Sequence, residues 1–178
     1  MMSEYRKPRA VSLAEQLLKK HGVTSAPTPV EEIAVAEGIK VVRAPAKGTE
    51  SAFLIRDGRR TIIGLNSRTS ARRQRFSIAH ELGHWQLHKG KRLIVDHSIR
   101  INNRDHVSSA GTDIEEIEAN NFAAALLMPR LLLQAAVDRE LDGEVASRDS
   151  LALTLAHEFD VSTEAMKFRL INLGIFVG

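Results

Sequence analysis

Apolar residues recur at helical spacing near the start of the chain. In "SLAEQLLKKHG" the leucines share one helical face, with Ser12 as the N-cap and Gly22 at the end. "TPVEEIAVAEG" repeats this plan, with Thr28 as the N-cap, Pro29 at the first helical position and Gly38 beyond the last turn. Both segments therefore predict short helices.

Shorter apolar runs follow, and they predict strands. They cover residues 39–44, 51–58 and 60–66, and the tight "RDGRR" between the last two predicts a β-hairpin. Helical spacing returns from about Ser70 to Leu87. The pattern favours an α+β fold that is mostly helical, with a small antiparallel sheet.

The second half of the chain is predominantly helical. Residues 91–113 are polar and turn-rich, and we expect them to be partly extended. Residues 113–128 form a strongly helical stretch, and a final helical region covers 129–173. Because no repeat or low-complexity linker separates these parts, we expect one domain over 1–178. Its residues 129–178 form a helical C-terminal lobe.

Composition narrows the class of protein. The 178 residues are 43% hydrophobic and 26% charged, as in an ordinary globular protein. The chain has no cysteine, which excludes disulfides and thiolate metal ligands. It also lacks the apolar core of a signal peptide and any run of about 18 apolar residues. We therefore expect a cytoplasmic protein without a membrane partner.

The charge of the chain is only mildly positive. A formal net charge of +3 is weak support for a nucleic-acid partner, because the basic residues are widely spread. The densest basic run is "SRTSARRQRF", residues 67–76. This run either solvates the outer face of the following helix or forms a basic lip on a cleft.

The segment "RFSIAHELGHWQLHKG", residues 75–90, carries the strongest chemical signal. His80 and His84 are one helical turn apart, so both imidazoles face the same point, as a Zn²⁺ site requires. Glu81 lies beside that point, where its carboxylate can take a proton from water. Gly83 has no side chain, so another element can approach the helix closely. The pattern predicts a catalytic metal site.

His88 lies one turn beyond this pair. Three ligands at successive turns of one straight helix cannot surround a tetrahedral ion, so His88 is not expected to be the third ligand. A longer metal-binding pattern fails as well, since Leu87 and Gly90 stand where it requires glycine and histidine. We expect His88 to contact the last carbonyls of the helix, with a contact to metal or substrate as the alternative.

The third ligand is expected from the helix over residues 113–128. Glu118 shares a stripe with Phe122, and a carboxylate on an apolar face is costly unless something such as a metal binds it. Glu116 points nearly the opposite way and is expected to be solvated. Glu115 follows Thr112 by three residues, the spacing of a capping box. Glu118 is therefore the predicted third ligand of one zinc ion per chain, with a fourth position open for water.

The segments "FSIAHELGHWQLH" and "EIEANNFAAALLMP" together resemble the ImmA/IrrE metallopeptidases. The order of helices and hairpin before them is also similar, so the resemblance covers most of the chain. It implies a zincin-like helix pair beside a short sheet. It also implies zinc bound by His80, His84 and Glu118, with Glu81 as general base.

The resemblance further implies a substrate. Members of this family act on a helix-turn-helix repressor, often encoded beside them in phage, mobile-element or stress-response loci, and cleavage turns on the repressed genes. This chain departs from the larger IrrE-type members in being short. A separate C-terminal sensor domain is therefore not expected.

The C-terminal segment "LAHEFDVSTEAMKFRLINLG" has the rhythm of a helix-turn-helix pair, with Val161 at the turn. Its second helix has only Lys167 and Arg169 as basic residues and few side chains suited to reading bases. Packing over the zinc helices is therefore favoured over direct DNA binding. Docking of a repressor's own helices is a third alternative.

Three functions fit these observations. The first is a zinc endopeptidase that cleaves a repressor, with the oxyanion stabilised by His97, Arg104 or His106, among which the spacing makes no choice. The second is a non-catalytic, metal-containing regulator that binds a repressor or DNA. The third is a zinc hydrolase acting on another kind of substrate, because H-E-x-x-H specifies activated water and not its target.

Overall fold

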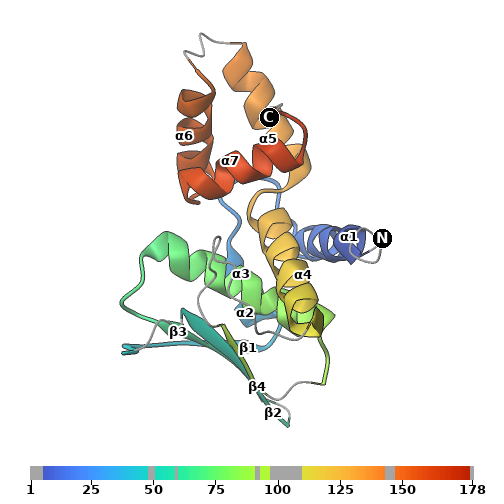
Figure 1. The fold of residues 1–178 in the computed structure, drawn as a ribbon, viewed down its shortest axis with the longest axis vertical. Helices are drawn as coiled ribbons and strands as arrows, with labels where there is room; N and C mark the ends of the chain where they lie inside the picture. The colour runs from blue at the N-terminus through green and yellow to red at the C-terminus, as the bar shows by residue number, and fades with distance from the viewer. Residues whose placement is uncertain are drawn as a thin grey trace.

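Two helices precede three strands, and five further helices and one strand follow them along the part of the chain that is described (Figure 1). The computed structural model describes residues 6–47, 51–58, 60–90, 93–96, 110–142 and 147–176. The elements in chain order are α1 (Arg6–Lys20), α2 (Val30–Ala36), β1 (Ile39–Ala44), β2 (Ala52–Asp57), β3 (Arg60–Asn66), α3 (Ala71–Leu87), β4 (Leu93–Asp96), α4 (Ala110–Leu127), α5 (Arg130–Leu141), α6 (Arg148–Glu158) and α7 (Thr163–Asn172).

The four strands form one sheet in the order β1-β3-β2-β4. β2 and β3 pair antiparallel, so the predicted hairpin is confirmed. β1 pairs parallel with β3, and β4 adds antiparallel to β2. The sheet is therefore mixed, because the chain leaves β1, passes to the far side of β3 as β2, and returns. β4 is the extended part that was expected within residues 91–113.

Helices cover the sheet in layers. α3 packs against β2 and β3, α4 packs on α3, and α1 packs on α4. Figure 1 shows α5, α6 and α7 at the end of the molecule opposite the sheet. Within the residues that the structure describes, no helix is both long and apolar enough to cross a membrane. The largest core side chains between these layers include Leu54, Ile63, Ile78, Leu82, Phe122 and Leu126.

Two of the predicted N-caps are wrong. α1 begins six residues before Ser12, whose hydroxyl accepts a bond from Gln16 inside the helix. The helix extends because Ala10 continues its buried face. The hydroxyl of Thr28 does not cap α2 but donates to the carbonyl of Leu126 at 2.9 Å, in the buried core. Both cases show tertiary packing overriding a local capping signal.

The basic run over residues 67–76 ties α3 to its neighbours. Arg72 and Arg75 both pair with Asp160 in the turn between α6 and α7. Arg75 also donates to the carbonyl of Thr28, and Arg73 donates to the hydroxyl of Ser51. The run therefore links α3 to the C-terminal lobe, to Thr28 before α2 and to Ser51 before β2. Neither the expected solvated helix face nor the expected basic lip on a cleft included this role.

The expected helix–turn–helix pair is present as α6 and α7. Val161 is buried at the turn, and α7 buries Met166 and Leu170. The Nε of Arg169 donates to the carbonyl of Met128, just beyond α4, at 3.1 Å. These contacts support the packing role, which was favoured over direct DNA binding.

Gly83 lets α4 approach α3. A Cβ at Gly83 would lie 3.0 Å from the Cα of Ala119 and 3.2 Å from the Cβ of Phe122. Because these atoms belong to a buried helix, they cannot move aside without shifting α4. The sequence-based expectation of a close approach here is confirmed.

We expect Gly83→Val to destabilise the protein by about 1–3 kcal/mol through overpacking, and to weaken metal binding because α4 shifts. Urea unfolding and zinc titration measure the two effects. Ala71→Val, at the exposed first residue of the same helix, is the matched control and should change neither much. Wild-type stability in Gly83→Val would contradict the tight contact.

Candidate metal centre

α3 turns two imidazoles toward one point. The hydroxyl of Ser70 accepts a bond from the N–H of Arg73 and starts the helix, which places His80 and His84 on its buried side. Their Nε2 atoms are 3.0 Å apart, and their rings meet edge to face. The predicted convergence of this pair is confirmed.

A carboxylate from α4 completes the cluster, and it belongs to Glu116. One oxygen of Glu116 lies 3.2 Å from the Nε2 of His80, and the other lies 3.2 Å from the Nε2 of His84. The three donor atoms lie within 4.8 Å of one another and could hold a metal ion. The expectation that Glu116 is solvated is therefore wrong, because its carboxylate contacts both histidines. Its side chain is 36% exposed, whereas those of His80 and His84 are 0% and 1% exposed.

Glu118 does not join His80, His84 and Glu116, the trio of candidate ligands, in the structure. Its carboxylate accepts a bond from the Nε2 of His88 at 2.9 Å. The buried position of Glu118 was expected correctly, but the partner that meets the carboxylate there is His88 and not the trio. The carboxylate that meets the two histidines in the structure is thus that of Glu116, and Glu118 as third ligand stays a prediction.

His88 lies between the trio and Glu118. Its N–H donates to the carbonyl of His84, as expected at a helix end, but its ring also contacts two side chains. The Nδ1 atoms of His88 and His84 are 2.9 Å apart. If His88 is neutral and donates its Nε2–H to Glu118, its Nδ1 must accept the Nδ1–H of His84. The Nε2 of His84 then has its lone pair directed at the trio.

Asn120 orients the ring of His80, as His88 orients that of His84. The Nδ1 of His80 lies 3.0 Å from the Oδ1 of Asn120, one helical turn after Glu116 on α4. Since an amide oxygen accepts, His80 donates from Nδ1 and its Nε2 lone pair also faces the trio. Outer partners of this kind fix the tautomer of metal-binding histidines. Two imidazole nitrogens with available lone pairs and one carboxylate are a donor set that fits zinc.

Burial and neighbouring charges favour this protonation state. Burial, with the two neighbouring histidines, lowers the pKa of His84 below its ordinary 6.5, although Glu116 opposes the shift. Burial alone would raise the pKa of Glu116, but the contacts with His80 and His84 more than offset it and hold the pKa well below 4.5. At neutral pH the site therefore combines a neutral His84 with an ionised Glu116.

Glu81 lies on α3 between the two histidines and is fully buried. Arg56 of β2 donates to the carbonyls of His84 and His88, at 2.9 and 2.8 Å, at the end of this helix. Burial lowers the pKa of Arg56, and attraction to Glu81 opposes that shift. A cation near Glu81 favours its ionised form, which a base requires.

Sequence reasoning missed Arg56 and Asn120. The only signal for Arg56 was a basic residue within an otherwise apolar strand. His97, Arg104 and His106, the candidates for stabilising an oxyanion, lie outside the described residues. Their roles stay predictions.

The shifted pKa of His84 predicts how stability depends on pH. Because its folded pKa lies below 6.5, the unfolded chain binds a proton there that the folded chain does not. Stability of the metal-free protein should therefore fall as pH decreases from 7.5 through 6.5 toward 5.5. Thermal unfolding with a chelator present measures this fall. The slope should be smaller in His84→Gln, and an equal slope would contradict the prediction.

In this structure α3 presents H-E-x-x-H and α4 presents a glutamate beside a mixed sheet. This arrangement is typical of hydrolases in which a metal ion activates water. The family model of the IrrE N-terminal-like domain, peptidase family M78, matches residues 34–171. The chain belongs to this family, as the two motifs indicated, and membership supports a metallopeptidase function. No curated protein matches the chain.

Proposed function

We propose that this protein is a zinc-dependent endopeptidase that cleaves a helix-turn-helix transcriptional repressor and so derepresses its genes. The observation that supports the peptidase activity most directly is the meeting of His80, His84 and Glu116 around one point. Each histidine also has a partner that directs its Nε2 lone pair there. The M78 family match supports the same activity independently.

The three residues of the trio would hold the metal. A bound zinc ion supplies a Lewis acid that lowers the pKa of water and polarises a carbonyl. The nitrogen and oxygen donors of the trio suit zinc, and the absence of cysteine excludes thiolate alternatives.

Glu81 would move the proton in this reaction. Its buried carboxylate accepts a proton from the attacking water and then passes it to the nitrogen of the leaving amine. The positive charge of Arg56 attracts the carboxylate of Glu81 and favours its ionised form. Asn120 and His88 hold the two imidazoles in position throughout.

The repressor substrate is inferred from the resemblance to the ImmA/IrrE group. The decisive experiment incubates the purified, zinc-loaded protein with the helix-turn-helix protein encoded nearest to it and measures intact masses. We expect two fragments from one site, and none when Glu81→Gln replaces the wild type. If the repressor releases its DNA but keeps its full length, a non-catalytic regulator replaces this proposal.

A further inference from the structure

An apolar groove of about 280 Å³ lies beside the metal centre. Three helices contribute to its walls: Phe76 from α3, Ile117 from α4 and Phe168 from α7. Ile117 is 51% exposed and Phe168 is 48% exposed, although both are large apolar side chains. Exposed apolar residues gathered around a hollow indicate a binding surface.

The groove is continuous with the candidate metal centre. Asn120 lines the groove and also bonds to His80. Phe76 lines it and stacks on the ring of His80, with centroids 6.3 Å apart. Among the trio only Glu116 has substantial exposure, and Ile117 follows it in the chain. Asn120 and Phe76 therefore place the groove next to His80.

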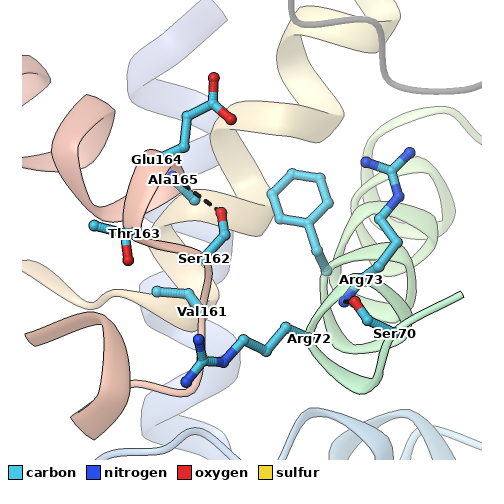
Figure 2. A pocket seen from close by; sticks show the side chains of 9 residues that line it. Ser70, Arg72, Arg73, Val161, Ser162, Thr163, Glu164 and Ala165 are labelled. Carbon is cyan, nitrogen blue, oxygen red and sulfur yellow. Dashed lines mark hydrogen bonds between the residues drawn. The ribbon is translucent and has the colours of Figure 1, made fainter. Parts of the chain in front are cut away.

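A second cavity, of about 370 Å³, extends the hollow along α3. It shares Phe76 and Ala165 with the groove, so the two cavities adjoin. Figure 2 shows Ser70 and Arg73 on one side of this cavity and the segment Val161–Ala165 on the other, with the side chain of Arg72 reaching toward Val161. The hydroxyl of Ser162 accepts a bond from the N–H of Ala165 and fixes that wall.

The lining favours a peptide over a nucleic acid. Arg169 is the one basic residue that lines the groove beside the metal centre, and it is 7% exposed. Its Nε is already bonded to the carbonyl of Met128. The adjoining cavity adds Arg72 and Arg73, but Arg72 is paired with Asp160 and Arg73 donates to the hydroxyl of Ser51. A phosphate backbone would need several accessible cations. Asn172 offers an amide that can bond to a peptide backbone, and Asn121 offers its Oδ1, since its Nδ2 donates to the carbonyl of Ile117.

We propose that this groove binds an apolar side chain of the substrate peptide next to the bond that is cleaved. The inference rests on the proposed peptidase function and adds the specificity of its site. α7 then serves as a wall of the substrate cleft, through Phe168. Substrates with a leucine-sized side chain at this position are preferred over those with glycine or an acidic residue.

Binding of zinc-chelating hydroxamates tests this without requiring turnover. N-acetylleucine hydroxamate and 2-isobutylsuccinyl hydroxamate carry an isobutyl group on opposite sides of the chelating group. Their glycine and unsubstituted succinyl counterparts are the references. Calorimetry on the zinc-loaded protein should show that at least one isobutyl compound binds about tenfold tighter than its reference, because the side chain leaves water.

Variants locate this gain in the groove. Ile117→Asn and Phe168→Asn should each remove most of the tenfold gain and leave the reference compounds unchanged. Leu153→Asn is the matched control, because Leu153 is 61% exposed on α6 and lines neither cavity. The full gain should persist in that control.

Two results would overturn the inference while leaving the peptidase function intact. One is reference binding without any isobutyl gain, or with a gain that Ile117→Asn and Phe168→Asn do not reduce. The other is tighter binding of N-acetylglutamate hydroxamate than of the leucine compound. If no hydroxamate binds the zinc-loaded protein at all, both the groove and the proposed function fail.

Discussion

Glu81→Gln should lower peptide cleavage by about 10²–10⁴-fold, the usual contribution of a general base, while zinc binding stays near the wild-type level. The amide has the shape of the carboxylate but cannot accept the proton of the attacking water. Zinc is retained because Glu81 is not one of the three donors that meet in the structure. Cleavage assays and metal analysis on the same preparation measure both quantities.

The surroundings of Glu81 support this separation of roles. The carboxylate is buried within α3, and Arg56 supplies a positive charge that favours the ionised form. Glu32→Gln, at an exposed position on α2, is the matched control for removing one negative charge and should keep full activity. Cleavage by Glu81→Gln at the wild-type rate would exclude Glu81 as the base. Loss of zinc from that variant would instead make Glu81 a ligand.

Features set by local sequence were predictable. β1 has the predicted bounds, and the hairpin of β2 and β3 follows from two apolar runs and a tight turn. The convergence of His80 and His84 follows from the helical period alone. Each of these depends on residues within a few positions of one another, where spacing determines geometry.

Features set by helix crossing were not predictable in the same way. The choice between Glu116 and Glu118 depends on where α4 meets α3, and that place is set by the contact of Gly83 with Ala119. The stripe argument identified Glu118 as buried, but burial does not name the partner, which is His88. The same holds for Thr28, whose bond to α4 joins residues 98 positions apart.

The roles of these two glutamates can be separated by metal affinity. Glu116→Ala should weaken zinc binding by more than about 100-fold, because it removes one of the three donors. Glu118→Ala should weaken it by about 10–100-fold, the usual effect of losing an outer partner. Competition with a chromophoric chelator measures both constants.

The physical difference between the variants should also appear in the spectrum of the cobalt-substituted protein. In Glu118→Ala, His88 loses its acceptor and holds His84 less firmly, but two imidazoles and a carboxylate still surround the metal. The visible cobalt bands should therefore keep their wild-type positions. In Glu116→Ala the donor set itself changes, so the bands should shift or disappear. If Glu118→Ala instead shifts the bands and loses more metal than Glu116→Ala, then Glu118 is the ligand and α4 is rotated in the metal-bound protein.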